Sequence, residues 1–422
     1  MNNKKWMAIL LGGIMAASLA APCSVSAAEK TTLTFWHAMG GTNGEVLQQI
    51  VDDFNASQDE IEIKAEYQGT YDDTITKLKA AMQSESGLPD VCQMYDVGTK
   101  FMYDSGAVIP VEDKFESTGY DKSSVMDVIS SYYTVEGKQY AMPFNVSTPM
   151  LYYNKDVFEA AGLDPETPPT TYDEVLEDAK KIVESGAAPV GYSQAIYGWF
   201  FEQQLAGLGV TYGNNDNGRT EAVTAVDFDS NGGGLKVFDM WKKLYDSGYF
   251  EDYGTTTADT QTAFFSGQVG MIIESTAILK NAVDSSPFEV GTGYLPRIEQ
   301  NDEGGVIIGG GSLWLTDTGN EANEDAAWKF IEYITTPDVQ AKWSMGTGYF
   351  AINEKAYETD DMKAYLKENP NFETAINQLK DSPVNCNTAG VLSGVQTEAR
   401  LTFNEIMPQV YDGKLTTQDA VD

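Results

Sequence analysis

The chain has 422 residues, which is too long for one ordinary hydrophobic core and long enough for two. It carries 63 acidic against 27 basic residues, and the net charge of −36 argues against nucleic acid or an anionic membrane surface as the main partner. The hydrophobic content of 42% is that of a globular protein, so a large disordered share is not expected.

The N-terminal segment has the pattern of a secretory signal peptide. Two lysines at positions 4 and 5 precede an apolar run over residues 6–21, and small residues follow. We expect a signal peptide over residues 1–27 and export across the cytoplasmic membrane, to a periplasmic or cell-surface location. A membrane anchor is the alternative, although the glycine-interrupted run is short for a membrane span.

Three cysteines raise separate questions. Cys23 lies before the expected cleavage position and makes lipid attachment an option, which the preceding Pro22 disfavours. Cys92 and Cys386 would remain in the exported chain. An exported protein can hold a disulfide, and the sequence leaves open whether these two residues form one or are separate buried thiols.

The first part of the expected mature chain alternates strands and helices. Residues 33–39 read as a strand and residues 42–54 as an amphipathic helix, which we expect to open with the capping box Thr42-x-x-Glu45. They are followed by a half-buried strand at 61–67, a helix around 75–82 and a buried strand at 90–96.

The region around residues 142–163 predicts a crossing between two lobes. The stretch "MPFNVSTPMLYYNKD" contains an apolar strand that is interrupted by Asn145, Ser147 and Thr148 between prolines, and then resumes. Prolines stiffen such a passage, and we expect the polar side chains to tolerate exposure of the backbone between the lobes. A strand broken in this way marks the position of a cleft.

The remainder of the chain repeats the alternation. The capping box Thr171-x-x-Glu174 predicts the start of a helix that stops at Gly186. Short apolar strands are expected at 270–275 and 312–317, and helices at 325–334 and 395–410. We expect the last of these helices to bury the residues Val395, Ala399, Phe403, Ile406 and Val410. Strands alternating with helices predict an α/β architecture.

Motifs for catalysis, metals and cofactors are scarce. His37 is the only histidine, which excludes an HExxH zinc site and any histidine cluster. The chain has no GxSxG or Walker A motif, and Gly309-Gly310-Gly311 lacks the remainder of a GxGxxG fingerprint. We therefore expect no cofactor, metal or catalytic residue. A carboxylate pair for glycoside hydrolysis stays open among the 63 acids.

Aromatic and arginine residues give the clearest hints of a binding site. Tyr71, Trp199 and Tyr349 stand beside polar or glycine residues at expected strand ends, a combination that suits sugars and polyols as well as an ordinary core. Arg400 is one of three arginines and lies early in the last long helix. It suits an anionic ligand, but composition alone favours an internal ion pair with one of the many acids.

Several motifs together resemble a known family, the extracellular solute-binding proteins that feed ABC importers. They are "TLTFWHAMGG", "YQGTYDD", "QMYDVGT", "PFNVSTPMLYYNKD", "VIIGGGSLWLTD" and "GTGYFAIN", in this order. The likeness spans residues 31–422 and is most specific to the family's glycerol-3-phosphate-binding members. It implies an α/β, two-lobed, periplasmic-binding-protein-like type II fold with a ligand cleft between lobes. It also implies that residues 28–145 and 296–340 form one lobe, and 146–295 and 341–422 the other.

The resemblance also implies a set of ligand-binding residues. Matched motif by motif, they are Tyr71, Asp96, Ser147, Trp199, Ser275 (with Thr276 as the other candidate), Gly310, Tyr349 and Arg400. The match of Arg400 to the family's anion-binding arginine reverses the preference drawn from composition. Asp96 is one methylene shorter than the family's usual glutamate, Ile196 stands where a tryptophan is usual, and Glu274 adds a carboxylate beside Ser275.

The implied function is that of a non-enzymatic, monomeric substrate-binding protein that captures a small molecule and delivers it to ABC permease subunits. The implied ligand is glycerol-3-phosphate or a glycerophosphodiester. A neutral sugar or oligosaccharide is the alternative, favoured by the aromatic residues and Glu274. A secreted glycoside hydrolase is a remote third reading, because no catalytic signature is evident.

Overall fold

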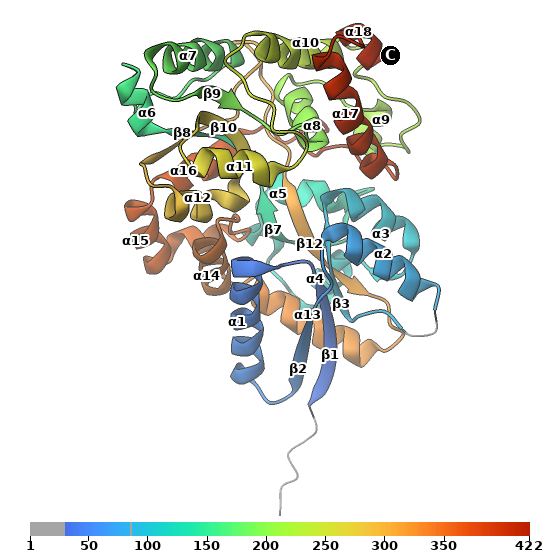
Figure 1. The fold of residues 1–422 in the computed structure, drawn as a ribbon. Coiled ribbons are helices and arrows are strands. Elements are labelled where there is room, and N and C mark those ends of the chain that lie inside the picture. Colours follow the sequence, from blue (N-terminus) through green and yellow to red (C-terminus); the bar gives the residue numbers. More distant parts are fainter. Residues whose placement is uncertain (1–29, 85–86) are drawn as a thin grey trace, which may run out of the picture.

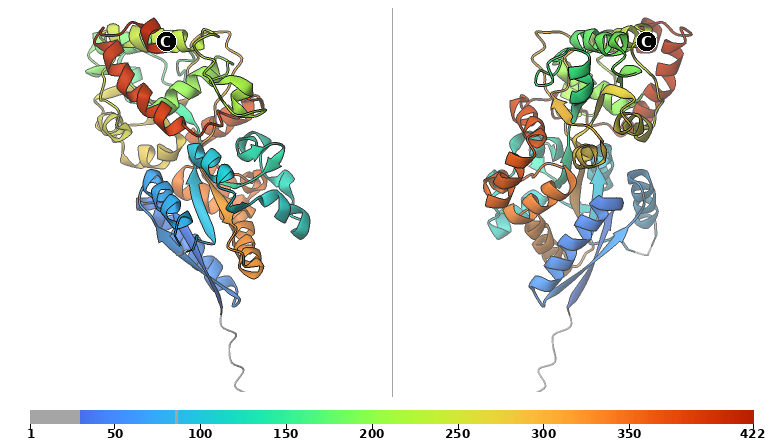
Figure 2. Two further views of the ribbon diagram at one scale, coloured as in Figure 1. Left: turned by 90° about the vertical axis from the view of Figure 1, so that its right-hand side faces the viewer. Right: turned by 60° about the vertical axis from the view of Figure 1, so that its left-hand side comes forward.

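Alternating strands and helices build two lobes in the computed structural model, which describes residues 30–84 and 87–422 (Figures 1 and 2). The expected signal peptide over 1–27 and Cys23 lie outside the described residues. Within the described part of the chain, no helix has both the length and the apolar character that a membrane crossing requires.

A six-stranded sheet forms the centre of the first lobe, which we call lobe one. Its strand order is β2 (Ile61–Tyr67), β1 (Thr31–His37), β3 (Val91–Tyr95), β12 (Gly309–Thr316) and β4 (Val108–Ile109), and β7 (Met142–Ser147) also pairs with β12. β1 runs parallel to β2 and β3, so their carboxyl ends meet at one edge of the sheet. β12 runs antiparallel to β3 and β7.

A four-stranded sheet forms the centre of lobe two. Its order is β11 (Val290–Gly293), β8 (Pro149–Asn154), β10 (Val269–Ser275) and β9 (Val190–Ser193). β8 runs antiparallel to β10 and β11, and β9 runs parallel to β10. A separate small hairpin joins β5 (Thr134–Val135) and β6 (Lys138–Gln139).

Helices surround both sheets (Figure 1). Around lobe one lie α1 (Gly41–Ser57), α2 (Tyr71–Met82), α3 (Thr99–Ser105), α4 (Val111–Thr118), α5 (Asp127–Ser130), α13 (Glu321–Ile334) and α14 (Pro337–Thr347). Around lobe two lie α6 (Lys155–Ala160), α7 (Tyr172–Ser185), α8 (Gly198–Gly207), α9 (Asn214–Gly218), α10 (Gly233–Asp246), α11 (Thr257–Phe265), α12 (Leu279–Ser285), α17 (Gln396–Tyr411) and α18 (Thr417–Val421). α15 (Asp360–Glu368) and α16 (Asn371–Asp381) lie beside α14 and β11. The short 3-10 turns are η1 (Asp96–Gly98), η2 (Lys122–Ser124), η3 (Ser131–Tyr133), η4 (Thr276–Ile278) and η5 (Glu354–Glu358).

The crossing predicted around residues 142–163 is confirmed. β7 belongs to the sheet of lobe one and β8 to the sheet of lobe two, with only Thr148 between them. The expectation that the polar residues tolerate exposure is wrong, because Asn145, Ser147 and Thr148 are all buried. Two of them bond to neighbouring segments at the contact of the lobes: the Asn145 side chain accepts from Gln93 at 2.7 Å, and the Thr148 amide donates to the Thr276 hydroxyl at 3.2 Å.

The second crossing runs from β11 to β12 and is held by a buried side chain. Gln203 of α8 donates from Nε2 to the Ile307 carbonyl at 2.7 Å and accepts from the Ile307 amide at 2.8 Å. The side-chain amide thus pairs with the crossing segment as a neighbouring strand would. The exact division of the residues between the lobes stays a prediction. The expected change at residue 340 falls inside α14, whose Trp343 stacks on Phe144 of β7 at 4.6 Å.

Two details of the predicted helices are wrong. α1 begins at Gly41 after Gly40, and no side chain caps it, so the capping box at Thr42 does not form. The second error concerns α17, where Val395 is 64% exposed while Gln396 and Arg400 are buried. The buried face of α17 is turned to include polar residues, because it faces the contact between the lobes as well as the core. The capping box at Thr171 and the stop at Gly186 are confirmed.

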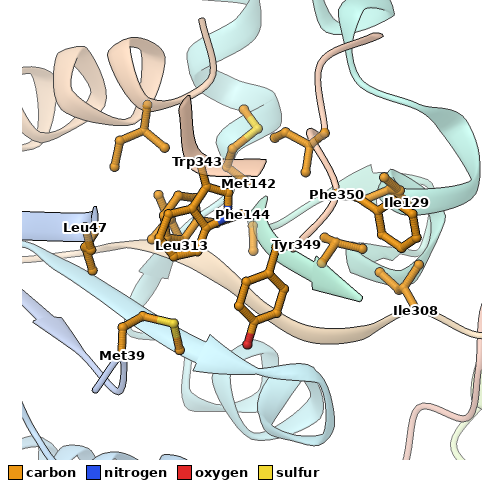
Figure 3. Packing of buried hydrophobic residues seen from close by; sticks show 14 of the residues in the cluster. Met39, Leu47, Ile129, Met142, Phe144, Ile308, Leu313, Trp343, Tyr349 and Phe350 are labelled. Carbon is orange, nitrogen blue, oxygen red and sulfur yellow. The ribbon is translucent and has the colours of Figure 1, made fainter. Parts of the chain in front are cut away.

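Large aromatic side chains dominate the cores. Figure 3 shows part of the core of lobe one, where the rings of Trp343, Phe144 and Tyr349 pack among aliphatic residues of β7, β12 and α1. In lobe two, Trp241 and Phe403 join α10 and α17. Cys92 and Cys386 are both free thiols, and burial raises the pKa of Cys92 to about 12.

Candidate binding site between the lobes

A buried ion cluster joins the two lobes. Arg400 of α17 donates from Nη2 to Oδ2 of Asp96 at 2.7 Å, and Asp96 follows directly after β3 in lobe one. The same guanidinium donates from Nε and Nη2 to the two carboxylate oxygens of Glu202 on α8, both at 2.7 Å. Gln396 adds a bond to Oε1 of Glu202 at 2.5 Å. All four side chains are buried.

The close approach of α8 to α17 sets this geometry. A Cβ atom on Gly198 would lie 2.5 Å from the Cα of Arg400, so only glycine allows the two helices to meet there. The Gly198 amide donates to Oδ1 of Asn404 at 3.0 Å, which fixes the start of α8 against α17. Burial disfavours the charged form of Arg400, but Asp96 and Glu202 more than offset this and raise its pKa well above the ordinary value.

A chain of hydrogen bonds leads from the edge of the first sheet to a tyrosine pair. Gln93 donates to Oδ1 of Asn145 at 2.7 Å, and Asn145 donates from Nδ2 to the hydroxyl of Tyr71 at 2.7 Å. The Tyr71 ring stacks on Tyr95 with 5.1 Å between centroids and 8° between planes. The Tyr95 hydroxyl lies 3.1 Å from the hydroxyl of Thr397 on α17, a second polar contact between the lobes.

Tyr349 joins the same cluster from the other side. Its ring stacks on Trp343 at 5.6 Å, and its hydroxyl points away from Trp343 (Figure 3). Burial raises the pKa of Tyr349, and hydrogen bonding to Asn145 and Tyr71 opposes that rise. Burial likewise raises the pKa of Tyr71, with Tyr349 as the next contributor. Both hydroxyls are therefore neutral at physiological pH and can donate to a ligand oxygen.

Gly310, Ser147 and Trp199 meet at the crossing strands. Gly310 has a φ of +89°, and a Cβ there would lie 1.8 Å from the Asn145 carbonyl oxygen, so no other residue fits. Ser147 pairs with Gly309 across the β7–β12 ladder. Trp199 of α8 packs on Gly309, where a Cβ would lie 2.6 Å from its ring. The buried Nε1 of Trp199 has no hydrogen-bond partner among the described residues, which is unusual for a buried donor.

Ser275 lies at the end of β10, opposite Pro149 of β8. Its hydroxyl accepts from the Ala277 amide at 3.1 Å, so part of its bonding capacity serves the turn η4. Glu274 beside it is buried and accepts from Gln261 and from the Ser275 amide, at 2.9 and 2.6 Å. Burial raises the pKa of Glu274. Thr276, the other candidate, is bonded to the crossing at Thr148.

Among the eight predicted residues, Arg400 contacts Asp96 directly. Tyr71, Gly310 and Tyr349 gather around Asn145, and Ser147 and Trp199 meet at Gly309, while Ser275 lies on β10. Their part in ligand binding stays a prediction. Glu202 and Asn145 were missed. A signal for Glu202 exists in "GWFFEQQLAG", where an acid stands within an apolar helix, a place where unpaired charges are rare.

A cavity of about 550 Å³ lies elsewhere, beside the second crossing, and is lined by Pro168, Thr292, Arg297 and Gln378, among others. None of the predicted ligand-binding residues lines it. Within the described residues, no group of three or more His, Cys, Asp or Glu side chains is placed to hold a metal ion. The interlobe cluster therefore remains the candidate site on the strength of its buried polar groups.

Comparison with known proteins identifies the family of the chain. A family profile described as "Bacterial extracellular solute-binding protein" matches residues 49–374. The sn-glycerol-3-phosphate-binding periplasmic protein UgpB of Escherichia coli strain K12 is 31% identical over 399 residues, covering 93% of this chain and 90% of that protein. UgpB of Yersinia pseudotuberculosis is also 31% identical, over 406 residues, with 94% and 92% covered.

Solved structures show the same fold. The cyclic α-maltosyl-1,6-maltose binding protein of Arthrobacter globiformis superposes with a TM-score of 0.77 at 25% identity, over 93% of this chain and 97% of that one. UgpB of Mycobacterium tuberculosis in complex with glycerophosphocholine gives a TM-score of 0.79 at 21% identity, over 93% and 96%. By its family profile and its likeness to UgpB over nearly the whole length, the chain belongs to the bacterial extracellular solute-binding proteins, the substrate-binding subunits of ABC importers.

Proposed function

We propose that the interlobe site captures a polyhydroxylated small molecule outside the cytoplasmic membrane and delivers it to the permease. The observation that carries this proposal is the concentration of buried hydroxyl, amide and carboxylate groups beside aromatic rings, where Arg400 meets Asp96 and Glu202. Sugars and glycerol derivatives present hydroxyl rims and apolar C–H faces, and such groups complement that combination.

Besides Arg400, seven predicted residues have roles in this proposal. Asp96 accepts bonds from ligand hydroxyls, while Tyr71 and Tyr349 donate to ligand oxygens. The free Nε1 of Trp199 donates as well, and its ring covers a carbon face. Further bonds at the crossing strands come from Ser147, Ser275 and the amide of Gly310. The protein acts as a monomer without catalysis and without nucleic acid, and reaches a periplasmic or cell-surface location through its signal peptide.

Two ligand classes fit this description. Glycerol-3-phosphate or a glycerophosphodiester is favoured by the 31% identity to UgpB proteins, which are glycerol-3-phosphate-binding. A neutral oligosaccharide is favoured by the likeness to the cyclic maltosyl-maltose binding protein and by the two carboxylates that face Arg400. Both classes share the hydroxyl-rich portion for which the site is proposed.

Titration calorimetry of the purified chain tests the proposal with glycerol-3-phosphate, glycerophosphocholine and a maltodextrin series. One-to-one binding of at least one of them is expected, and loss of that binding in the Trp199→Ala variant would assign it to this site. The absence of binding to all of them would contradict the proposal for these ligand classes. Product analysis after incubation with oligosaccharides checks the glycoside hydrolase reading, for which we expect no cleavage.

A further inference from the structure

The hydrogen-bonding edges of Arg400 are already occupied by protein groups. The two carboxylate oxygens of Glu202 accept hydrogen bonds from Nε and Nη2, and Asp96 accepts the second hydrogen bond that Nη2 donates. Only Nη1 makes no hydrogen bond to the described residues. A phosphate group is normally held by two parallel N–H donors of one guanidinium. No such pair of donors is free on Arg400 while Glu202 stays in place.

The net charge of the cluster also disfavours a phosphate ligand. Arg400 contributes one positive charge, whereas Asp96 and Glu202 contribute two negative charges, so the buried group carries a formal net charge of −1. Among the described residues, no other cation forms an ion pair with either carboxylate. A phosphate monoester dianion brought into this buried place would meet repulsion that water does not screen.

Arg219 adds no positive charge to the cluster of Arg400, Asp96 and Glu202. Arg219 lies near the same lobe contact, but its guanidinium donates to main-chain carbonyls of Tyr132 and Gly390, at 2.9 Å from Nη1 and 3.0 Å from Nη2. The Cζ atom of Arg219 also lies over the Tyr132 ring, 5.3 Å from its centroid. This cation therefore ties segments of the chain together. The cluster depends on Arg400 alone for its positive charge.

We infer that Glu202 determines ligand specificity, because it occupies Arg400 and makes the cleft select neutral carbohydrates over phosphate esters. This inference rests on the proposed function, since it concerns which polyhydroxylated ligand the site accepts. With Glu202 and Asp96 in place, Arg400 offers Nη1 to a single hydroxyl oxygen, and the two carboxylates accept from neighbouring hydroxyls. Vicinal hydroxyls of a sugar ring present this pattern of one acceptor and adjacent donors.

The test is calorimetry of the wild type and the Glu202→Gln variant with glycerol-3-phosphate and a maltodextrin series. Gln keeps the shape and an oxygen for Gln396 and Nε, but it removes one negative charge. We expect the wild type to bind a maltodextrin more tightly than glycerol-3-phosphate. In Glu202→Gln, affinity for glycerol-3-phosphate should rise by about tenfold or more, and affinity for the maltodextrin should fall.

Two matched variants separate this effect from total charge and from misfolding. Glu405→Gln removes an equal charge from the exposed face of the same helix α17 and should leave both affinities unchanged. Glu202→Gln combined with Arg400→Gln should show no gain for glycerol-3-phosphate, because the gain acts through the guanidinium. Melting curves verify that each variant is folded at the titration temperature.

The outcomes distinguish this inference from the proposed function. Tight wild-type binding of glycerol-3-phosphate, or an unchanged phosphate affinity in folded Glu202→Gln, would overturn the role of Glu202 and leave the proposed function standing. If neither protein binds any of these ligands, the proposed function fails and the inference fails with it. A gain of equal size in Glu405→Gln would mean that total charge acts, and would also overturn it.

Discussion

Arg400 is the residue on which the structure of the site depends most. Replacing it by alanine leaves Asp96 and Glu202 buried without their counter-charge, and breaking a buried ion pair from one side costs about 3–5 kcal/mol. We expect Arg400→Ala to lower the free energy of unfolding by that amount, as measured by urea denaturation. The double variant with Glu202→Gln should recover part of the loss. A single variant as stable as the wild type would show that the cluster is not buried in solution.

We predict that Asp96 contributes to ligand binding as well as to the ion cluster. Asp96→Asn keeps the size of the side chain and one oxygen acceptor, but it removes the charge that strengthens a hydrogen bond from a ligand hydroxyl. Such a loss is worth about 1.5–3 kcal/mol, so the dissociation constant of the tightest ligand should rise roughly 10- to 150-fold. Calorimetry measures the change, and a melting curve serves as the control for folding. Equal affinities would remove Asp96 from the binding site.

At the scale of elements, α7 shows how a local motif supports the sheet of lobe two. Thr171 accepts from the Glu174 amide at 3.2 Å, and the helix then buries Val175, Ala179 and Ile182. Thr171→Ala should therefore lower the free energy of unfolding by about 1 kcal/mol. Thermal and urea unfolding measure this change, and Thr170→Ala provides a neighbouring comparison.

The cap also predicts a dependence on pH. Hydrogen bonds from the Thr170 hydroxyl and amide lower the pKa of Glu174 from its ordinary value of 4.5. A carboxylate whose pKa is lower in the folded state stabilises the fold above the unfolded-state pKa, and this contribution disappears as pH falls through the folded-state pKa. The stability difference between wild type and Glu174→Gln should thus shrink on acidification from pH 4.5 downward. A constant difference would show that the cap does not lower the pKa.

The elements that could be predicted from the sequence are those whose pattern is local. Alternation in β2, the capping box of α7 and the proline-bounded break between β7 and β8 all depend on neighbouring residues, and all are found. The buried face of α17 was mispredicted because Arg400 bonds to Asp96 and Glu202, which are far away in the chain. The start of α1 was also mispredicted, since the helix begins after Gly40 without any side-chain cap. Glu202 was missed for the same reason: its partner Arg400 is 198 residues away.

For the whole molecule, we predict that closure moves two discontinuous bodies. Residues 28–145 and 296–340 should move as one body when crystal structures with and without ligand are compared, because the crossing strands bend only between the lobes. Residues 146–295, together with α17 and α18, should form the other body, whereas α14 should stay with the first because Trp343 packs on Phe144 of β7. A comparison in which residues 146–295 stay fixed to the first body would contradict this division.

The contacts between the lobes predict the conformation of the free protein. Asp96–Arg400 and Tyr95–Thr397 both join the lobes through groups of the protein itself. Asp96→Asn combined with Thr397→Val should therefore open the ligand-free molecule and increase its radius of gyration in small-angle scattering. A saturating ligand should restore the compact value. An unchanged radius in the free double variant would show that these contacts do not hold the lobes together.

The ion pair between Asp96 and Arg400 also has a consequence for energy use during transport. We expect a receptor that closes without cargo to present the permease with the same surface as a loaded one, and thereby to stimulate ATP hydrolysis without transport. Cargo that binds beside this pair adds only the bonds that the pair leaves open, so the measured affinity reports those bonds and not the contact that already joins the lobes. The strength of the Asp96–Arg400 contact would thereby influence how many ATP molecules are hydrolysed for each cargo molecule that is delivered.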